Sequence, residues 1–260
     1  MRFTLHNAAQ STCSQRVRFA LHAKAVSFTE VRLDLFAGDQ LRPAYLALNP
    51  NGVVPSLIDG GQVVTDSAVI LEYLDDILPD VACFRPADPL AAARMRAMVR
   101  FIDEVPGPAI RVPSYNLAFL PHFQAMTPQA FQALCDSKPL RREFLMRMGQ
   151  TGFPKPEMDE ALGRLSRGVA RIADWLEQKG GPWLLGDILS QADLCAMPVI
   201  VRMDDIGLYH LWDNLPAIGA WLDRIRATPE FAQTYYDGSL LTQKYPHLAA
   251  LRAERARVSA

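Results

Sequence analysis

The hydrophobic period of the sequence changes once, near residue 80, and this change constrains the fold more than any other feature. Before it, short segments with strand-like alternation are interleaved with segments of helical period. After about residue 88, every periodic segment is helical. The stretch between, LPDVACFRPADP, holds three prolines and no periodic pattern, which is typical of a linker. We therefore predict an α/β domain at 1–79, a linker at 80–88 and an all-helical domain at 89–260.

The first domain shows the signals of a small mixed sheet. RFTLH reads as a strand, an amphipathic helix follows it, and VSFTEVRLDL alternates like a second strand. VPSLI and QVVT flank Asp59, Gly60 and Gly61, which predicts a hairpin. AVILEYLDDIL then has helical period. The order strand, helix, strand, short helix, hairpin, helix predicts strands that run in both directions.

Composition excludes several classes of function. The 260 residues carry 27 Lys and Arg against 28 Asp and Glu, so nucleic acid is not expected as the main partner. No apolar run approaches the roughly 20 residues that span a bilayer, and the N-terminus lacks the apolar core of a signal peptide. The four cysteines are far apart and form no CxxC pair, which favours neither zinc nor disulfides. We expect a cytoplasmic, soluble protein with no metal, no nucleotide and no membrane partner.

Four small polar or thiol residues, Ser11, Thr12, Cys13 and Ser14, stand where the first helix should begin. A helix start leaves backbone N–H groups without partners, and a serine or threonine oxygen commonly caps them. The same N–H groups favour a negative charge. The loop therefore fits either a plain cap or a site for an anionic sulfur.

A second group of residues suits the backbone of a small peptide. Pro55 opens a strand and cannot donate to its ladder. If the Val54–Pro55 bond were cis, the Val54 backbone could pair with an extended peptide; the alternative is an ordinary turn proline. Ser67 at a helix start suits a carboxylate, and Asp66 beside it suits an ammonium. Both residues equally fit a simple helix cap.

The element order, with the motifs NPNGVVPSL, TDSAVILEYL and WLLGDILSQADLCAMP, resembles the glutathione S-transferase superfamily over nearly the whole chain. In the last motif, Ser190 and Asp193 form a capping box with a structural role. The resemblance implies a thioredoxin-like first domain, an all-helical second domain and glutathione as co-substrate. It also implies a homodimer.

The resemblance further implies where glutathione binds. Its cysteinyl backbone would lie at Val54 and Pro55, and its γ-glutamyl head at Asp66 and Ser67. Gln40 is our candidate for the glycine end. The sulfur would lie at the start of the first helix.

The residue that contacts the sulfur is predicted from branches of the superfamily. Ser11 matches the serine of some branches, Cys13 the cysteine of the bacterial beta class, and Ser14 the serine of bacterial β-etherases. No tyrosine is present in the first strand, and no resolving cysteine follows Cys13. Segments such as TGFPKPEMDEALGRLSRGVARI resemble the helical domain of the β-etherases, so we place Ser14 first, then Ser11, with Cys13 as the redox alternative and Thr12 last.

This branch implies that glutathione thiolate attacks the carbon bearing an aryl ether, giving a thioether and a phenol, as in lignin degradation and the catabolism of aromatic compounds. The alternatives are a non-catalytic glutathione-binding protein and a reductase dependent on Cys13. The region after the linker, where prolines interrupt residues 106–156, predicts short helices and a loop over a cleft. Candidate contacts for the aromatic electrophile, each of which also fits core packing, are Met98, Phe101, Ile102, Tyr115, Asn116, Phe119 and His122.

Overall fold

Four strands form one mixed sheet at the start of the chain. The computed structural model describes residues 2–250. The strands are β1 (Phe3–Asn7), β2 (Phe28–Arg32), β3 (Ser56–Asp59) and β4 (Gln62–Thr65), in the order β2-β1-β3-β4. β1 pairs with β2 in parallel and with β3 antiparallel, and β3 pairs antiparallel with β4. The predicted hairpin and the mixed strand directions are confirmed.

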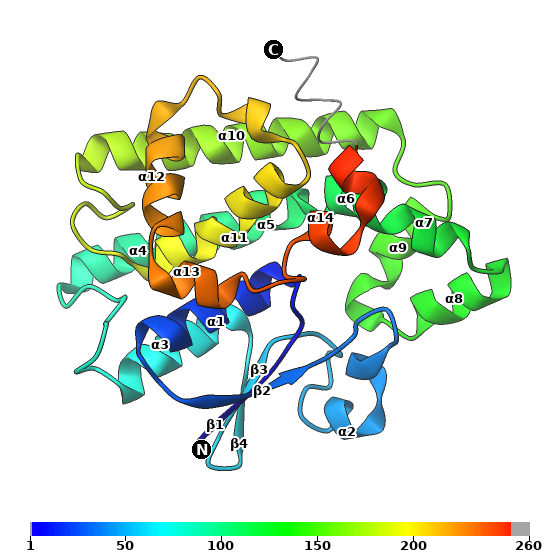
Figure 1. Cartoon of the computed structure of the whole chain (residues 1–260), viewed down its shortest axis with the longest axis horizontal. Helices are drawn as coiled ribbons and strands as arrows, with labels where there is room; N and C mark the ends of the chain where they lie inside the picture. Colours follow the sequence, from blue (N-terminus) through cyan, green and yellow to red (C-terminus); the bar gives the residue numbers. More distant parts are fainter. Residues whose placement is uncertain (1, 251–260) are drawn as a thin grey trace.

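The helices of the first domain lie on both faces of this sheet. α1 (Thr12–Ala23) and α3 (Ser67–Ile77) lie between the sheet and the rest of the molecule (Figure 1). A 3-10 turn (Asp39–Leu41) leads into α2 (Pro43–Leu46), and the Tyr45 ring of α2 lies 5.8 Å from that of His6 on β1. Because neighbouring strand residues point to opposite faces, His6 faces α2 while Leu5 is buried on the side of α1 and α3.

Every element after α3 is helical, so the predicted fold class is confirmed. The helices are α4 (Pro89–Glu104), α5 (Pro106–Ala109), α6 (Arg111–Ser114), α7 (Leu120–Gln124), α8 (Pro128–Asp136), α9 (Arg142–Met148), α10 (Lys155–Lys179), α11 (Gln191–Asp205), α12 (Pro216–Arg226), α13 (Pro229–Thr234) and α14 (Leu241–Lys244), with a π-helical turn at Tyr115–Phe119 and 3-10 turns at Pro139–Arg141 and Tyr209–Leu211. The predicted linker falls in the irregular stretch between α3 and α4. The boundaries stay predictions, and the predicted domain end at residue 260 lies outside the described residues.

The proline-rich region at 106–156 is more helical than its composition suggests. Pro106, Pro121 and Pro128 each stand in the first turn of a helix (α5, α7 and α8). A proline there loses no hydrogen bond, because the first N–H groups of a helix have no intrahelical partner. The prolines therefore divide this region into the predicted short helices, and a non-helical stretch remains at 149–154.

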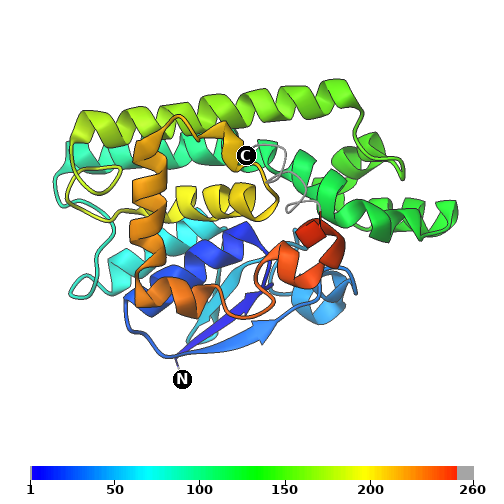
Figure 2. The ribbon, with the colours of Figure 1, turned by 45° about the horizontal axis from the view of Figure 1, so that its top comes forward.

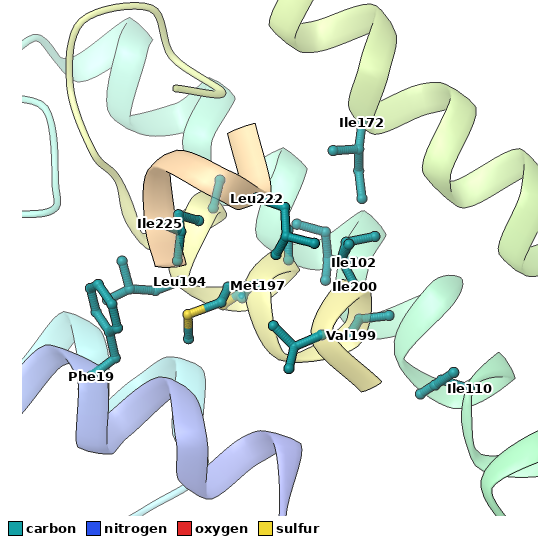
Figure 3. Close-up of a cluster of buried hydrophobic side chains, with 14 of the residues drawn as sticks. Phe19, Ile102, Ile110, Ile172, Leu194, Met197, Val199, Ile200, Leu222 and Ile225 are labelled. Atoms are coloured by element: carbon teal, nitrogen blue, oxygen red, sulfur yellow. The ribbon is translucent and has the colours of Figure 1, made fainter. Parts of the chain in front are cut away.

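One apolar core joins the two domains. Phe19 of α1 packs into the same buried cluster as Leu194 and Met197 of α11 and Leu222 of α12 (Figure 3). All four side chains are at most 3% exposed. Since burial of this apolar surface stabilises both domains together, α1 is held against α11 and the start of α1 has a fixed position relative to the helical domain.

A buried ion pair ties the linker to this core. Lys24 Nζ lies 2.8 Å from Asp75 Oδ1, and both side chains are fully buried. Lys24 also donates to the carbonyls of Val81 and Ala82 (3.3 and 3.1 Å). Asp75 accepts the Phe84 N–H (3.2 Å) and the Gln191 amide (2.8 Å). The pair thus joins the end of α1, α3, the linker and the start of α11.

The capping box that starts α11 has the predicted structural role. Asp193 Oδ2 accepts the backbone N–H of Ser190 at 2.9 Å, and its other oxygen accepts the Leu184 N–H and the Trp221 indole N–H, each at 2.9 Å. Every one of these contacts is buried, so Asp193 holds the helix start and the preceding loop in place.

Candidate functional site

A cavity of about 230 Å³ lies between the two domains. We call it the interdomain cavity. From the first domain it is lined by Ala8, Gln10, Ser11, Thr12, Cys13, Leu33, Asp34, Leu35, Phe36, Gln40, Asn51, Gly52, Val53 and Val54, and from the helical domain by Arg111, Tyr115, Phe119, Phe123, Lys138, Leu140, Arg141, Arg202 and Lys244. Three of the four residues predicted for the sulfur site, Ser11, Thr12 and Cys13, therefore line this cavity. Two of the predicted pocket residues, Tyr115 and Phe119, line it as well.

The N-terminus of α1 offers hydrogen-bond donors to the interdomain cavity. Ser11 is the N-cap, and its Oγ accepts the Ser14 N–H at 3.2 Å. The Ser11 hydroxyl proton has no acceptor among residues 2–250, and neither have the backbone N–H groups of Thr12 and Cys13. Since a hydroxyl can accept and donate at once, Ser11 serves as a cap and can still donate to an anion. Three donors and the positive end of the helix thus face one place.

Ser14 is not brought into the interdomain cavity. Its side chain is fully buried, and its Oγ accepts the backbone N–H of Ala8 at 3.3 Å. α1 begins at Thr12, so Ser14 already belongs to the first turn and points toward the β1–α1 loop. The residue that we placed first for the sulfur contact therefore has a structural partner in place of a ligand.

The end of the chain holds the β1–α1 loop in position. Arg18, fully buried, donates to the carbonyls of Ala8 (3.2 Å), Ala9 (2.9 Å) and Thr234 (3.0 Å). Gln15 donates to the Ser239 carbonyl at 3.2 Å. Figures 1 and 2 show the red segment that contains α14 above this loop, beside the green helices that follow α5. The sulfur site predicted in the first domain is thus set by contacts from residues more than 200 positions away.

The strand edge predicted to pair with a peptide also lies at the interdomain cavity. The Val54–Pro55 bond is cis, and the Val54 backbone makes no hydrogen bond within residues 2–250. Tyr45 and Asn49 fix the turn before it by donating to the Val53 carbonyl (2.6 and 2.9 Å). A free, rigid backbone donor and acceptor beside the α1 N-terminus suits an extended peptide.

Gln40 lines the same cavity and has an unused acceptor. Its Nε2 donates to the Leu35 carbonyl at 3.2 Å, whereas Oε1 is buried without any hydrogen bond. A buried polar atom without a partner costs free energy, so a donor from a ligand would stabilise it.

The pair predicted for the γ-glutamyl head caps α3. Asp66 has a positive φ of 69° and accepts the N–H groups of Ala68 (2.9 Å) and Val69 (3.2 Å). Ser67 is buried. Neither residue lines the interdomain cavity, and Pro55 does not line it either. The structure supports the capping interpretation of Asp66 and leaves its contact with a ligand as a prediction.

Aromatic rings form the opposite wall. Tyr115 lies 5.0 Å from Phe119 and stacks on Phe123 at 5.8 Å, and Phe36 from the first domain meets Phe119 at 5.3 Å. Burial raises the pKa of Tyr115, so its hydroxyl stays protonated and can donate. The wall suits a planar aromatic ligand that is held near the α1 N-terminus.

Comparisons with known proteins identify the family of the chain. Two family models, for the N-terminal and the C-terminal domain of glutathione S-transferases, match residues 10–77 and 155–224. A maleylacetoacetate isomerase of Emericella nidulans is 31% identical over 217 residues, which is 80% of this chain and 81% of that protein. The chain belongs to the glutathione S-transferase family.

Protein LigF of Sphingobium sp. (strain NBRC 103272 / SYK-6) is 28% identical over 242 residues, 90% of this chain and 93% of that protein. The crystal structure of the β-etherase LigF from the same strain superimposes with a TM-score of 0.83 at 27% identity, covering 90% of this chain and 99% of that one. The chain is thus similar to a β-etherase, and it is also similar to isomerases of the same family.

Five of the predicted pocket residues of this glutathione S-transferase do not line the interdomain cavity. Met98 and Phe101 face a groove between α4 and α10, where the Phe101 ring lies 5.4 Å from Trp175. Ile102 is fully buried in the shared core. Asn116 is bonded to the backbone of the segment before α10, and His122 packs its ring 4.3 Å from that of Phe36, where burial lowers its pKa.

The sequence analysis did not predict the cations that line the cavity, and three of them lie beside the aromatic wall. Arg111 belongs to α6, Lys138 precedes the 3-10 turn Pro139–Arg141, and Arg141 ends that turn. Arg111 lies 27 and 30 positions before the other two in the sequence, and no motif links it to them. The three side chains come together only because the fold brings α6 and the turn after α8 to the same cavity.

Within residues 2–250, no three His, Cys, Asp or Glu side chains are grouped as metal ligands would be. No helix in that range has the length and apolar character needed to cross a membrane.

Proposed function

We propose that this protein cleaves β-aryl ethers with glutathione. The observation that carries the proposal is the interdomain cavity itself, in which the donors of the α1 N-terminus face a wall of aromatic rings (Ser11 to Cys13 against Tyr115 and Phe119). The similarity to a β-etherase supports this choice of reaction.

Glutathione would bind along the first domain. Its cysteinyl backbone pairs with Val54, and Gln40 Oε1 accepts an N–H from the tripeptide, while Asp66 and Ser67 remain our candidates for the γ-glutamyl head. The sulfur then lies at Ser11, Thr12 and Cys13. A free thiol has a pKa of about 8.5, and a hydroxyl, two amides and a helix N-terminus all favour its thiolate. We now assign the donor hydroxyl to Ser11, because Ser11 lines the cavity and the buried Ser14 does not.

The reaction follows from this arrangement. The thiolate attacks the carbon that bears the aryl ether, α to a ketone, so that a C–S bond forms and the C–O bond breaks. The phenolate leaves with the electron pair and takes up a proton, and the products are a glutathione thioether and a phenol. The aromatic wall holds both reactants close and excludes water, which lowers the entropy cost of the encounter.

Isomerisation is the second candidate function. The isomerase from Emericella nidulans is 31% identical, and a substrate such as maleylacetoacetate carries carboxylates that Arg111, Lys138 and Arg141 could bind. In this reaction glutathione would add to the substrate and leave again, so no thioether would accumulate.

Product analysis separates these functions. Incubation with glutathione and a model β-aryl ether ketone should give stoichiometric thioether and phenol by mass spectrometry. Cys13→Ala should retain activity within about threefold, because Cys13 offers its amide and that amide remains. Loss of activity in Cys13→Ala would favour the Cys13-dependent reductase, isomerised maleylacetoacetate without thioether would favour the isomerase, and glutathione binding without any turnover would favour a non-catalytic protein.

We also propose a cytoplasmic homodimer. Large apolar side chains are exposed on three elements that follow one another in the sequence. They are Val63 on β4 (36% exposed), Val69 on α3 (53%) and Leu90 at the start of α4 (59%). Covering such side chains with a second copy removes apolar surface from water. Light scattering should give twice the chain mass of 28.9 kDa, and Val69→Asp should shift the mass toward the monomer. A wild-type protein of monomeric mass would contradict the proposal.

A further inference from the structure

The interdomain cavity is strongly positive although the chain as a whole is not. The net charge of the protein is −1, whereas the cavity lining holds one carboxylate, Asp34, and the five cations Arg111, Lys138, Arg141, Arg202 and Lys244. This concentration of charge needs an explanation, because like charges that share a partly closed space repel each other.

Two of the five cations, Arg202 and Lys244, interact with polar groups of the protein. Arg202 is buried and donates to the Gln10 carbonyl in the β1–α1 loop. Lys244 is attracted to the Asp34 carboxylate, which itself caps the turn by accepting the N–H groups of Phe36 (2.8 Å) and Ala37 (3.2 Å). These contacts fix the loops around the cavity and occupy Asp34, the carboxylate of its lining. Asp103, which does not line the cavity, still acts on Arg111 from a distance beyond an ion pair.

Arg111, Lys138 and Arg141 have no carboxylate within 4 Å among residues 2–250. Arg141 donates to the neighbouring Leu140 carbonyl only. Burial lowers the pKa of Arg111 and of Lys138, and the charge of Arg141 lowers both further. Three cations therefore stay together at a cost in free energy that an anion would offset.

Their position differs from that of the residues expected to bind the glutathione backbone. Gln40 and Val54 belong to the first domain, whereas all three cations come from the helical domain and accompany the aromatic wall. Arg111 and Arg141 both act electrostatically on Tyr115, and Arg111 also acts on Cys13 at the α1 N-terminus. The cations thus lie beside the rings that would hold the second substrate.

We infer that the second substrate is an aromatic compound with a carboxylate, which Arg111, Lys138 and Arg141 bind while its ring packs on Tyr115. The inference rests on the proposed function, because it places the electrophile on the helical side of the cavity. Guanidinium groups match a carboxylate with two parallel hydrogen bonds. A neutral aryl ether would leave the three charges uncompensated.

A pair of matched substrates tests this inference. Two β-aryl ether ketones are compared that differ only in a ring carboxylate or its methyl ester. The wild type should have a kcat/KM about tenfold or more higher for the acid, since a hydrogen bond between charged groups supports a change of that order. Arg111→Ala and Arg141→Ala should each reduce kcat/KM about tenfold more for the acid than for the ester, and Arg111→Lys should recover part of the loss.

Arg142→Ala is the matched control. Arg142 follows Arg141 directly but pairs with Asp136 at 2.8 Å and does not line the cavity, so the preference for the acid should remain. Equal losses on acid and ester would overturn the inference. A larger rise in the KM for glutathione than for the acid would also overturn it, because the cations would then bind the carboxylates of glutathione.

Failure of the proposed function gives a different result, in which the wild type turns over neither ether. Calorimetry then decides the inference separately, with an aryl carboxylate and its amide titrated into the glutathione-loaded protein. Tighter binding of the carboxylate by the wild type and by Arg142→Ala, lost in Arg111→Ala and Arg141→Ala, supports the anionic subsite. Equal binding of both compounds excludes it.

Discussion

Replacing Asp75 with Ala should destabilise the protein by about 3–5 kcal/mol, because it leaves a buried ammonium without its counter-ion. Lys24 is fully buried and lies 2.8 Å from Asp75. The same substitution removes the acceptor for the Phe84 N–H and the Gln191 amide. Urea denaturation at one fixed protein concentration measures the loss, since a dimer's stability depends on concentration.

Asp76→Ala is the control for this prediction. Asp76 is the next residue of α3, but its side chain is 56% exposed and pairs with Arg85 at the surface. Exposed pairs of this kind contribute up to about 1 kcal/mol, so the urea midpoint should hardly move. Equal losses for the two variants would show that the buried pair contributes no more than a surface pair.

Ser11→Ala should lower kcat/KM roughly 10- to 100-fold, which corresponds to the 1.5–3 kcal/mol of a hydrogen bond to a charged group. Ser11 lines the interdomain cavity, and its hydroxyl proton has no acceptor among residues 2–250. Without it, the pKa of bound glutathione rises, so less thiolate is present at a given pH. The pH at which the rate is half-maximal should therefore move upward by roughly one unit, and Ser11→Thr should restore the profile.

Ser14→Ala separates this effect from damage to the fold. Removing the Ser14 hydroxyl leaves the Ala8 N–H unsatisfied and should cost about 1–3 kcal/mol of stability, while the pH profile of the rate stays in place. If Ser14→Ala moved the profile and Ser11→Ala did not, the assignment of the donor to Ser11 would be refuted.

Much of the fold could be predicted from the sequence because its signals are local. The change of period near residue 80, the turn at Asp59 to Gly61 and the Ser190–Asp193 capping box each depend on a few neighbouring residues, and all appear in the structure. The prolines of 106–156 were harder to interpret. A proline can stand in the first turn of a helix or interrupt a helix, and only the surrounding packing distinguishes the two cases.

The site could be predicted only in part. The four candidates of the β1–α1 loop were found together, but their order depended on where α1 begins, and helix starts are uncertain by one or two residues in a sequence. Each residue turns the helix by about 100°, so that uncertainty decides whether Ser11 or Ser14 faces the ligand. Arg111 and Arg141 carry no local signal, because only the three-dimensional fold brings α6 and the turn after α8 to the same cavity.

The contacts of the β1–α1 loop also determine when it can form during synthesis. Three hydrogen bonds of this region need residues made 216 to 228 positions later. They join Arg18 to Thr234, Gln15 to Ser239 and Gln10 to Gly238. Domains generally fold in the order in which they emerge from the ribosome, and the strands and helices of the first domain are complete by residue 77. The loop after β1 nevertheless stays incomplete until residues 234–239 have been made, so a chain truncated before Thr234 would lack the contacts that hold the site.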